Sequence, residues 1–330
     1  MIDDRPDLPG LELLCYHQTA PMLRVVDPAT GGQRLFGGQK RFEQAVSGVL
    51  PRAGWVAGWA GRTYRFSLAA DVKATRLPRG WAHVASSDRR CIWVPGADPG
   101  TWTEYDGVAD EHGREVRLDG VHLVADTPHG LLTVDRYDRT MRLVDRDDPT
   151  AERTRWSGGD DPLTVNDSTV VWREGVTRLR VEHLDTGTTV PVVLPLWQLH
   201  RYPTGPASFS PDGRRLALTG DAIVGPVPLD LPKKERDTRK RQCSGLVIVD
   251  LVDGSAELVH GYFEDFAYTP VWSADGAWIF LGVPSEGAMY AVAVDAPERR
   301  LRRVEGLGRS AAMPMIDLGH ARADVARPAG

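Results

Sequence analysis

Two stretches of the chain repeat one hairpin pattern, and this repetition constrains the fold more than any other feature. SFSPDGRRLAL at 208–218 and VWSADGAWIFL at 271–281 each place an Asp-Gly pair between two short apolar runs. Asp-Gly favours a tight hairpin turn, because glycine adopts positive φ freely and the aspartate side chain bonds nearby backbone amides. A hairpin that recurs in this way indicates repeated supersecondary units.

A second series of hairpins gives the period of the repeat. Each has an aspartate at its turn, and successive aspartates are 35–45 residues apart except for one spacing of 65. The long spacing contains an insertion at 221–242, without which it falls to about 43. A period near 40 with four strands per repeat is typical of β-propeller blades. The turn aspartates are Asp27, Asp71, Asp106, Asp145, Asp185, Asp250 and Asp295.

These patterns predict an all-β protein. Helical periodicity is almost absent, although 36–46 would suit a short helix or a loop turn. We predict a single domain over residues 1–330, a seven-bladed β-propeller of four-stranded antiparallel blades, with six blades as the alternative. A spare apolar strand at about 311–318 would join three N-terminal strands and close the ring. The insertion at 221–242 would form a basic loop and 319–330 a short C-terminal tail.

The Ser-Pro-Asp-Gly core of 208–218, with its variant at 271–281, resembles the TolB-like propeller repeat and, more broadly, WD-repeat-like propellers. The resemblance covers these two repeats, and the other five are degenerate. It implies a propeller fold and a role in protein binding. TolB-like domains are often six-bladed and exported, and this chain departs from the family on both points.

Composition narrows the class of partner. The formal net charge of −5 at pH 7 favours neither nucleic acid nor an acidic surface as the main partner. The start MIDDRPDLPG lacks the charge pattern of a secretory signal, and no apolar run is long enough to span a membrane. Cys15, Cys91 and Cys243 lie far apart, which suggests free thiols in a reducing compartment. We therefore expect a cytoplasmic protein with no membrane partner.

Charged residues precede each expected innermost strand, and the connections that hold them would gather at one mouth of the central channel. Carboxylates and arginines converging on a concave mouth would bind a cation, an amine or a charged peptide end. The alternative is that they are solvated loop charges that satisfy local turns. The residues at the predicted channel mouth are Arg79, Asp119, Asp160, Asp161, Arg201, Tyr202, Glu264 and Asp265.

Two histidines would begin innermost strands of adjacent blades. His83 and His122, with Asp126 shortly after, would face the channel as acid/base groups or metal ligands. No H-E-x-x-H motif or close Cys/His cluster accompanies them, which favours a structural role and predicts no metal site. If the protein is an enzyme, we expect His83, His122 and Asp161 to carry the chemistry.

The insertion carries a local positive charge. It would be able to contact phosphate or an acidic partner. No aromatic residue interleaves to stack on bases, so a mobile, solvated loop is the alternative and nucleic acid is a disfavoured partner. Its basic residues are Lys233, Lys234, Arg236, Arg239, Lys240 and Arg241.

No catalytic motif is recognised. The chain has no G-x-S-x-G elbow and no P-loop, and the glycines at 306–311 precede a strand-like run in place of the helix that a dinucleotide site needs.

Most of the ten tryptophans would fill the spaces between blades, while Trp102, Trp156 and Trp197 fall near strand ends and would be able to bind a partner. We predict a non-enzymatic binding or scaffold propeller that recognises a peptide or protein partner, without a cofactor. The alternative is a small-molecule lyase, isomerase or hydrolase with its active site in the channel.

Overall fold

The computed structural model describes residues 8–17, 22–35, 46–50, 55–59, 63–67, 75–76, 84–85, 91–96, 98, 100–106, 112–118, 120–135, 137–156, 161–199, 207–222, 232, 244–263, 267, 269–304 and 312–317. Every helix or strand assigned in these ranges is a β-strand, as the turn spacing predicted. The expected short helix at 36–46 lies almost wholly outside them. No helix in the described residues is long and apolar enough to cross a membrane.

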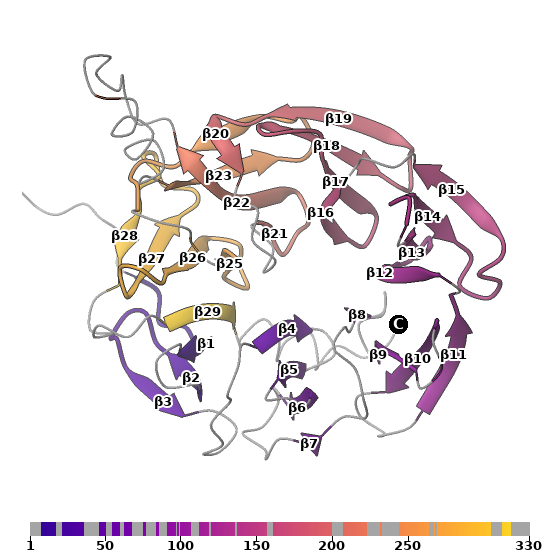
Figure 1. Ribbon diagram of the computed structural model, residues 1–330. Helices are drawn as coiled ribbons and strands as arrows, with labels where there is room; N and C mark the ends of the chain where they lie inside the picture. The colour runs from indigo at the N-terminus through magenta and orange to yellow at the C-terminus, as the bar shows by residue number, and fades with distance from the viewer. Residues whose placement is uncertain are drawn as a thin grey trace, which may run out of the picture. The chain divides into compact units, whose positions relative to one another are not determined.

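The strands of the described residues form seven sheets, numbered here along the chain (Figure 1). Sheet 1 contains β29 (Ala312–Asp317), β1 (Leu13–His17), β2 (Met22–Val26) and β3 (Gln33–Leu35), in that order. Sheet 2 contains β4 (Val46–Leu50), β5 (Trp55–Trp59), β6 (Thr63–Ser67) and β7 (Thr75–Arg76). Sheet 3 contains β8 (Val84–Ala85), β9 (Cys91–Pro95), β10 (Thr101–Asp106) and β11 (His112–Arg117).

In three of the remaining sheets consecutive strands are again neighbours, and sheet 6 is the exception. Sheet 4 contains β12 (Val121–Thr127), β13 (Gly130–Asp135), β14 (Met141–Val144) and β15 (Glu152–Trp156). Sheet 5 contains β16 (Asp161–Asn166), β17 (Thr169–Arg173), β18 (Arg178–His183) and β19 (Thr188–Val193). Sheet 6 contains β20 (Leu196–Leu199), β21 (Ala207–Phe209), β22 (Arg215–Ala222), β23 (Ser244–Asp250) and β24 (Ala256–Leu258). Sheet 7 contains β25 (Val271–Trp272), β26 (Trp278–Val283), β27 (Ala288–Ala293) and β28 (Arg302–Arg303).

The chain forms two compact units. Unit 1 holds the described residues within 1–41, 173–181 and 190–320, and unit 2 holds those within 42–172 and 182–189. Each unit is described by itself below. That the whole chain is one domain, and that the seven sheets are the blades of one ring, stay predictions.

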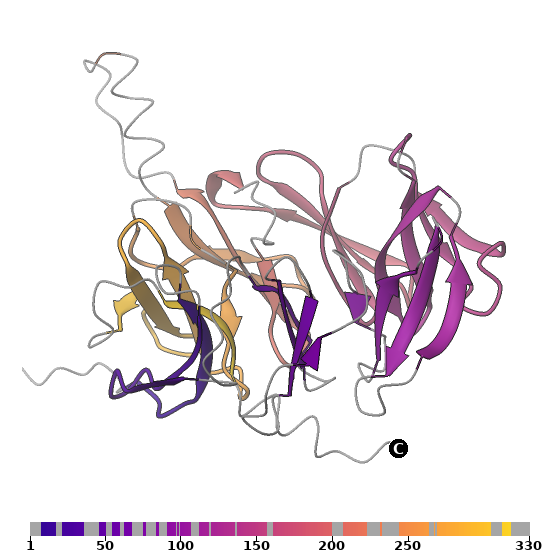
Figure 2. The ribbon, with the colours of Figure 1, turned by 60° about the horizontal axis from the view of Figure 1, so that its bottom comes forward.

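The pairing of the C-terminal strand with the N-terminal sheet is confirmed. β29 runs antiparallel to β1, with Leu13 opposite Asp317 and His17 opposite Ala312. Figures 1 and 2 show the yellow β29 beside the indigo β1. A bulge falls between Leu14 and Cys15, where the register shifts by one residue. The pairing occupies the backbone edge of β1 that would otherwise stay open to other strands.

Sheet 6 departs from the expected four strands. The extra strand β20 arises because β22 is eight residues long whereas β21 covers only three, Ala207–Phe209. The free end of β22, around Gly220, therefore has backbone groups left to pair, and β20 takes them through Leu199 and Leu196. The sequence pattern had assigned one inner strand to this unit.

The core of unit 1 lies between neighbouring sheets. Successive side chains on a strand point to opposite faces, so each apolar strand packs against two neighbours. On β26, Phe280 packs in one cluster with Leu13 and Val26 of sheet 1. The next residue, Ile279, packs in another cluster with Leu246 of sheet 6. Burial of such a side chain contributes roughly 1.5–3 kcal/mol relative to exposure.

Unit 2 repeats this arrangement around sheet 4. Leu131 joins Trp93 and Trp102 of sheet 3, whereas the adjacent Leu132 joins Trp172 of sheet 5. The predicted core role of the strand tryptophans is confirmed for Trp93 and Trp172, which are fully buried. Two tryptophans at strand ends, for which partner binding was considered, are buried as well: Trp102 and Trp156 are 4% and 8% exposed.

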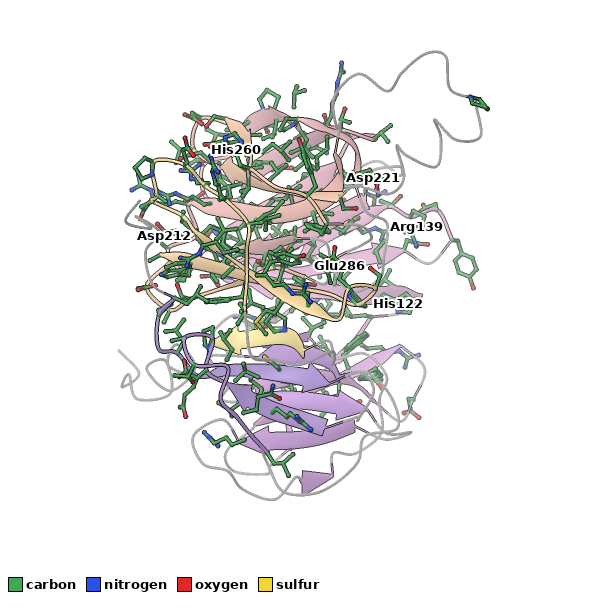
Figure 3. All side chains as sticks on the ribbon, turned by 90° about the vertical axis from the view of Figure 1, so that its left-hand side faces the viewer. His122, Arg139, Asp212, Asp221, His260 and Glu286 are labelled. Atoms are coloured by element: carbon green, nitrogen blue, oxygen red, sulfur yellow. The ribbon has the colours of Figure 1, made fainter. Side chains whose placement is uncertain are left out.

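The two Asp-Gly hairpins that define the repeat share one hydrogen-bond pattern. In the turn before β26, the hydroxyl of Ser273 donates to Asp275 Oδ1 over 2.5 Å and accepts from the amide of Trp278 over 2.9 Å. The Asp275 carboxylate also accepts from the amide of Ala277, and Gly276 takes a positive φ of 72°. The hydrogen bond from Ser273 lowers the pKa of Asp275. An identical serine-centred set, with Asp212 labelled in Figure 3, recurs at 210–215.

The outer hairpins use aspartate differently. At the turn before β15, Asp145 Oδ1 accepts from the amides of Asp147 and Asp148, over 2.7 and 3.2 Å. Asp148 Oδ1 then accepts from the amide of Thr150. This pair of linked aspartate turns recurs in the outer turn of sheet 6 at Asp250–Ser255, and also in the turn between β13 and β14 at Asp135–Thr140. Asp145 and Asp250, two of the aspartates that gave the repeat period, therefore accept hydrogen bonds from backbone amides of their own turns.

The pairing of β29 with β1 leads to a test by truncation. A chain that ends after residue 311 loses the strand that covers β1, so we expect its melting midpoint to fall by roughly 10 °C or more and its tendency to aggregate to rise. A chain that ends after residue 318 keeps β29 and serves as the control. Thermal unfolding followed by circular dichroism measures both; equal midpoints for the two chains would contradict the stabilising role of β29.

Candidate functional site

Most of the residues predicted at the channel mouth lie outside the described residues. This holds for Arg79, Asp119, Asp160, Arg201, Tyr202, Glu264 and Asp265. His83, expected to carry chemistry if the protein is an enzyme, also lies outside them, as does the whole basic loop, Lys233, Lys234, Arg236, Arg239, Lys240 and Arg241. Asp161 is the first residue of β16, and its backbone alone is described. His122 is the second residue of β12 and is exposed, as Figure 3 shows.

A polar cluster in unit 2 lies at the opposite end of these strands. Its residues come from the end of β12, from the β12–β13 and β14–β15 turns of sheet 4, and from neighbouring strands of sheets 3 and 5. In an antiparallel sheet these two turns lie at one end, whereas His122 and Asp161 lie near the other. The seven residues of β12 span roughly 20 Å, so the polar cluster is distinct from the predicted channel mouth.

Asp126 is the centre of the first part of this cluster. Its carboxylate is 1% exposed, and its Oδ2 accepts from the indole nitrogen of Trp93 over 2.8 Å. Its Oδ1 accepts from Arg146 Nη2 over 2.5 Å and from Arg146 Nε over 3.2 Å. Arg146 also donates to the carbonyl of Thr127. The charge of this buried carboxylate is thus balanced by one guanidinium, and an indole N–H donates a further hydrogen bond to it, as burial of charge requires.

The chain of contacts continues to sheet 3. Arg114 of β11 donates to the backbone carbonyl of Arg146 and pairs through Nη1 with the carboxylate of Asp147, 2.7 Å away. The Asp147 side chain is 89% exposed, so the last pair is solvated and contributes little to stability. Arg146 and Arg114 therefore connect sheets 3 and 4 through a series that runs from a buried carboxylate to an exposed one.

Outside this cluster, a second carboxylate receives two indoles. One of them, Trp156, lies at the His122 end of sheet 4. Glu182 of β18 accepts from Trp156 Nε1 over 2.9 Å and from Trp172 Nε1 over 2.9 Å. The two rings lie 5.2 Å apart between centroids and are tilted by 44°. Both indole N–H groups are thereby satisfied within the core, which large aromatic side chains need when buried. Glu182 positions the rings, and the contact supports the packing of sheet 4 on sheet 5.

Two histidines with hydroxyl partners complete the cluster. His129 Nε2 and Ser168 Oγ lie 2.9 Å apart, across the β12–β13 and β16–β17 turns. His183 Nδ1 and Thr169 Oγ1 lie 3.3 Å apart within sheet 5. All four residues are partly buried. An imidazole beside a hydroxyl can accept its proton, so this part of the cluster is chemically competent for proton transfer.

The β14–β15 turn, which contacts His129, holds an aspartate whose pKa is lowered. Arg153 donates to Asp145 Oδ2 and, through Nη1, to the carbonyl of His129 over 2.8 Å. The Arg153 hydrogen bond, with the amides of Asp147 and Asp148, lowers the pKa of Asp145 to about 2. Asp145 therefore stays ionised through the physiological range. Among the described residues, no group of three or more His, Cys, Asp and Glu side chains would hold a metal ion.

Sequence reasoning noticed Asp126 and missed its partners. It also missed His129 and Ser168. The signal was present, because TPHG at 127–130 and NDST at 166–169 occupy the same place in successive repeats, directly after the innermost strand. Superposing the repeats would have brought these two turns together, although the repeat pattern alone does not say which side chains meet.

Comparison with protein-family models finds no match, and no curated protein matches the sequence. Solved structures do match. The β-propeller domain of Myceliophteria thermophila Cps50 (Swd1) aligns with a TM-score of 0.52 and 14% identity, over 81% of this chain and 88% of that chain. The chain has a β-propeller fold.

Two further structures align at the same TM-score of 0.52. U3-55K is 10% identical over 80% of this chain and 82% of that chain. Dihydro-heme d1 dehydrogenase NirN in complex with DHE is 13% identical over 96% of this chain and 77% of that chain. At these identities the likeness concerns the fold alone, and the resemblance to TolB-like repeats is matched by no family model.

The buried carboxylate leads to a first test of the propeller's polar cluster. Asp126→Ala leaves the Trp93 indole and the Arg146 guanidinium without their acceptor, so we expect it to lower the free energy of unfolding by about 2–4 kcal/mol. Asp147→Ala, at the exposed end of the same series, should change it by less than about 0.5 kcal/mol. Urea unfolding at pH 7 compares the two, and similar losses would show that burial does not set the importance of Asp126.

Acid unfolding gives a second test. Because the folded pKa of Asp145 is about 2, below the ordinary aspartate value near 3.9, its contribution is present above about pH 4 and is lost as the pH falls towards 2. Asp145→Asn removes this titration, so its unfolding free energy should fall less steeply than that of wild type between pH 4 and 2. Urea unfolding across this range measures the slopes, with Ser285→Ala as a neutral control; an unchanged slope in Asp145→Asn would contradict the shift.

Proposed function

We propose that this chain is a binding protein, a seven-bladed propeller that recognises a peptide or protein partner at the mouth of its channel. One observation carries the proposal: apolar side chains of sheets 1 and 3–7 pack in clusters between neighbouring sheets, while the polar residues at the strand ends differ from repeat to repeat in the sequence. A repeated frame with variable ends is the arrangement by which repeat proteins present a binding surface.

The residues proposed to contact the partner are those predicted at the channel mouth. They combine carboxylates with two arginines and one tyrosine, a set that suits a charged peptide through charge-assisted hydrogen bonds and ring contact. They are Arg79, Asp119, Asp160, Asp161, Arg201, Tyr202, Glu264 and Asp265. We further propose a cytoplasmic location, kinship with TolB-like repeats, and an accessory role for the basic loop in contacting an acidic segment of the partner.

A second candidate is a small-molecule enzyme that uses His83, His122 and Asp161. The observation that favours it is the placement of His122 near the start of β12 and of Asp161 at the start of β16, the equivalent ends of innermost strands in successive sheets. A fold-level likeness to NirN, a dehydrogenase, is compatible with this alternative. Turnover of a substrate that is lost in His122→Gln would support it over the binding role.

The binding proposal is tested by partner capture followed by direct measurement. Tagged protein is used to isolate partners from its native lysate by photo-crosslinking, and each reproducible partner is purified for titration. Charge reversal at the mouth, Arg201→Glu and Asp265→Lys, should raise the dissociation constant at least tenfold, which corresponds to about 1.4 kcal/mol each. Tyr137→Ala, which removes an 89% exposed ring on the β13–β14 turn, is the control and should leave binding unchanged.

Two results would overturn this proposal. One is that no partner is captured reproducibly. The other is that a captured partner binds the mouth variants as tightly as wild type, which would place the interface elsewhere on the propeller.

A further inference from the structure

Ser168 and His129 form a hydroxyl–imidazole pair of a kind that activates nucleophiles. The Oγ to Nε2 distance of 2.9 Å is within the range for proton transfer, and both residues are partly buried. They come from equivalent turns of successive repeats, β12–β13 and β16–β17, so the pairing depends on the packing of sheet 4 on sheet 5. A preformed pair of this sort needs no rearrangement before reaction.

The backbone of His129 is fixed on both sides. Its amide donates to Thr127 Oγ1 over 3.2 Å, and the same hydroxyl donates to the carbonyl of Gly130 over 2.9 Å. Its carbonyl accepts from Arg153 Nη1 over 2.8 Å, and Arg153 is itself held by the carboxylate of Asp145. These contacts fix the backbone of His129 within sheet 4 and so set the position from which its imidazole reaches Ser168.

The backbone of Ser168 is also held. Its carbonyl accepts from the amide of Leu184 over 2.7 Å, which ties the β16–β17 turn to the end of β18. The preceding residue, Asp167, has a positive φ of 28°, a conformation that is costly for a residue with a Cβ. The turn thus presents the serine hydroxyl to His129 in a conformation that the surrounding bonds maintain.

From this geometry we infer that Ser168 is a nucleophile and His129 its general base, forming a site for acyl transfer from small carboxylic esters to water. Ser168 Oγ attacks the ester carbonyl carbon while its proton passes to His129 Nε2. The carbon–oxygen bond to the alcohol then breaks, and the departing alkoxide takes that proton, which leaves an acyl group on Ser168. Water attacks this acyl-serine, with His129 again accepting and returning the proton, to release the carboxylic acid.

This inference is independent of the proposed binding role. The pair lies at the turn end of the strands, away from the predicted mouth, and uses none of the residues proposed to contact a partner. It would replace the expectation of a non-enzymatic protein by that of a binding propeller with a modest esterase activity. Failure of one proposal leaves the other standing, because different residues and different readouts test them.

The experiment uses a fluorophosphonate probe, which phosphonylates activated serines, and p-nitrophenyl acetate as the ester. With the full-length protein we expect the probe to label the peptide that contains Ser168 and the ester to be hydrolysed. Ser168→Ala should abolish both signals, and His129→Gln should lower the labelling rate by a factor of 10² or more. Ser285→Ala, at an exposed serine on the β26–β27 turn, is the matched control and should behave as wild type.

A second measurement keeps the test decisive if His129→Gln does not fold. Ser168→Cys places a thiol beside the imidazole, so its alkylation by iodoacetamide at pH 7 should be at least tenfold faster than that of Ser285→Cys. The inference is overturned if the probe labels other serines only, if labelling of Ser168 is insensitive to His129 in a folded variant, or if the two thiols react equally. Any of these results would show that the 2.9 Å hydrogen bond between His129 Nε2 and Ser168 Oγ only links the two turns and has no catalytic role.

Discussion

The structure depends on strands that are apolar on both faces. In β26, successive residues such as Ile279 and Phe280 belong to different clusters, one shared with sheet 6 and the other with sheet 1. A strand of this kind cannot be stable at a solvated surface, because each exposed face would forfeit roughly 1.5–3 kcal/mol per large side chain. Sheets 4 and 7 accordingly have a neighbouring sheet packed on each face.

At the strand ends, aspartate side chains stabilise the turns by accepting hydrogen bonds. Asp275 takes the hydroxyl of Ser273 and one amide, whereas Asp145 takes two amides and an arginine. Both arrangements satisfy backbone donors that the ladder leaves unpaired where the chain reverses. Because these carboxylates accept hydrogen bonds within turns, their presence in the sequence reflects chain reversals and carries little information about ligands.

How far the sequence predicts this molecule follows from the range of the interactions involved. The Asp-Gly hairpins and the pairing of β29 with β1 were predictable, because local turn chemistry and a spare apolar strand leave few alternatives. The strand β20 was missed, since it exists only because β22 extends past β21. The contacts of Asp126 with Trp93 and Arg146, and of His129 with Ser168, join separate repeats at the level of single atoms. Periodicity brings such turns together without specifying which side chains touch.

The pairing of β29 with β1 has a consequence for synthesis. The two strands are about 300 residues apart in the chain, so β1 leaves the ribosome long before the strand that pairs with it. At 5–20 residues per second, β1 waits roughly 15–60 s for its partner. During that interval the backbone edge of β1 is open on the nascent chain and can pair with other strands.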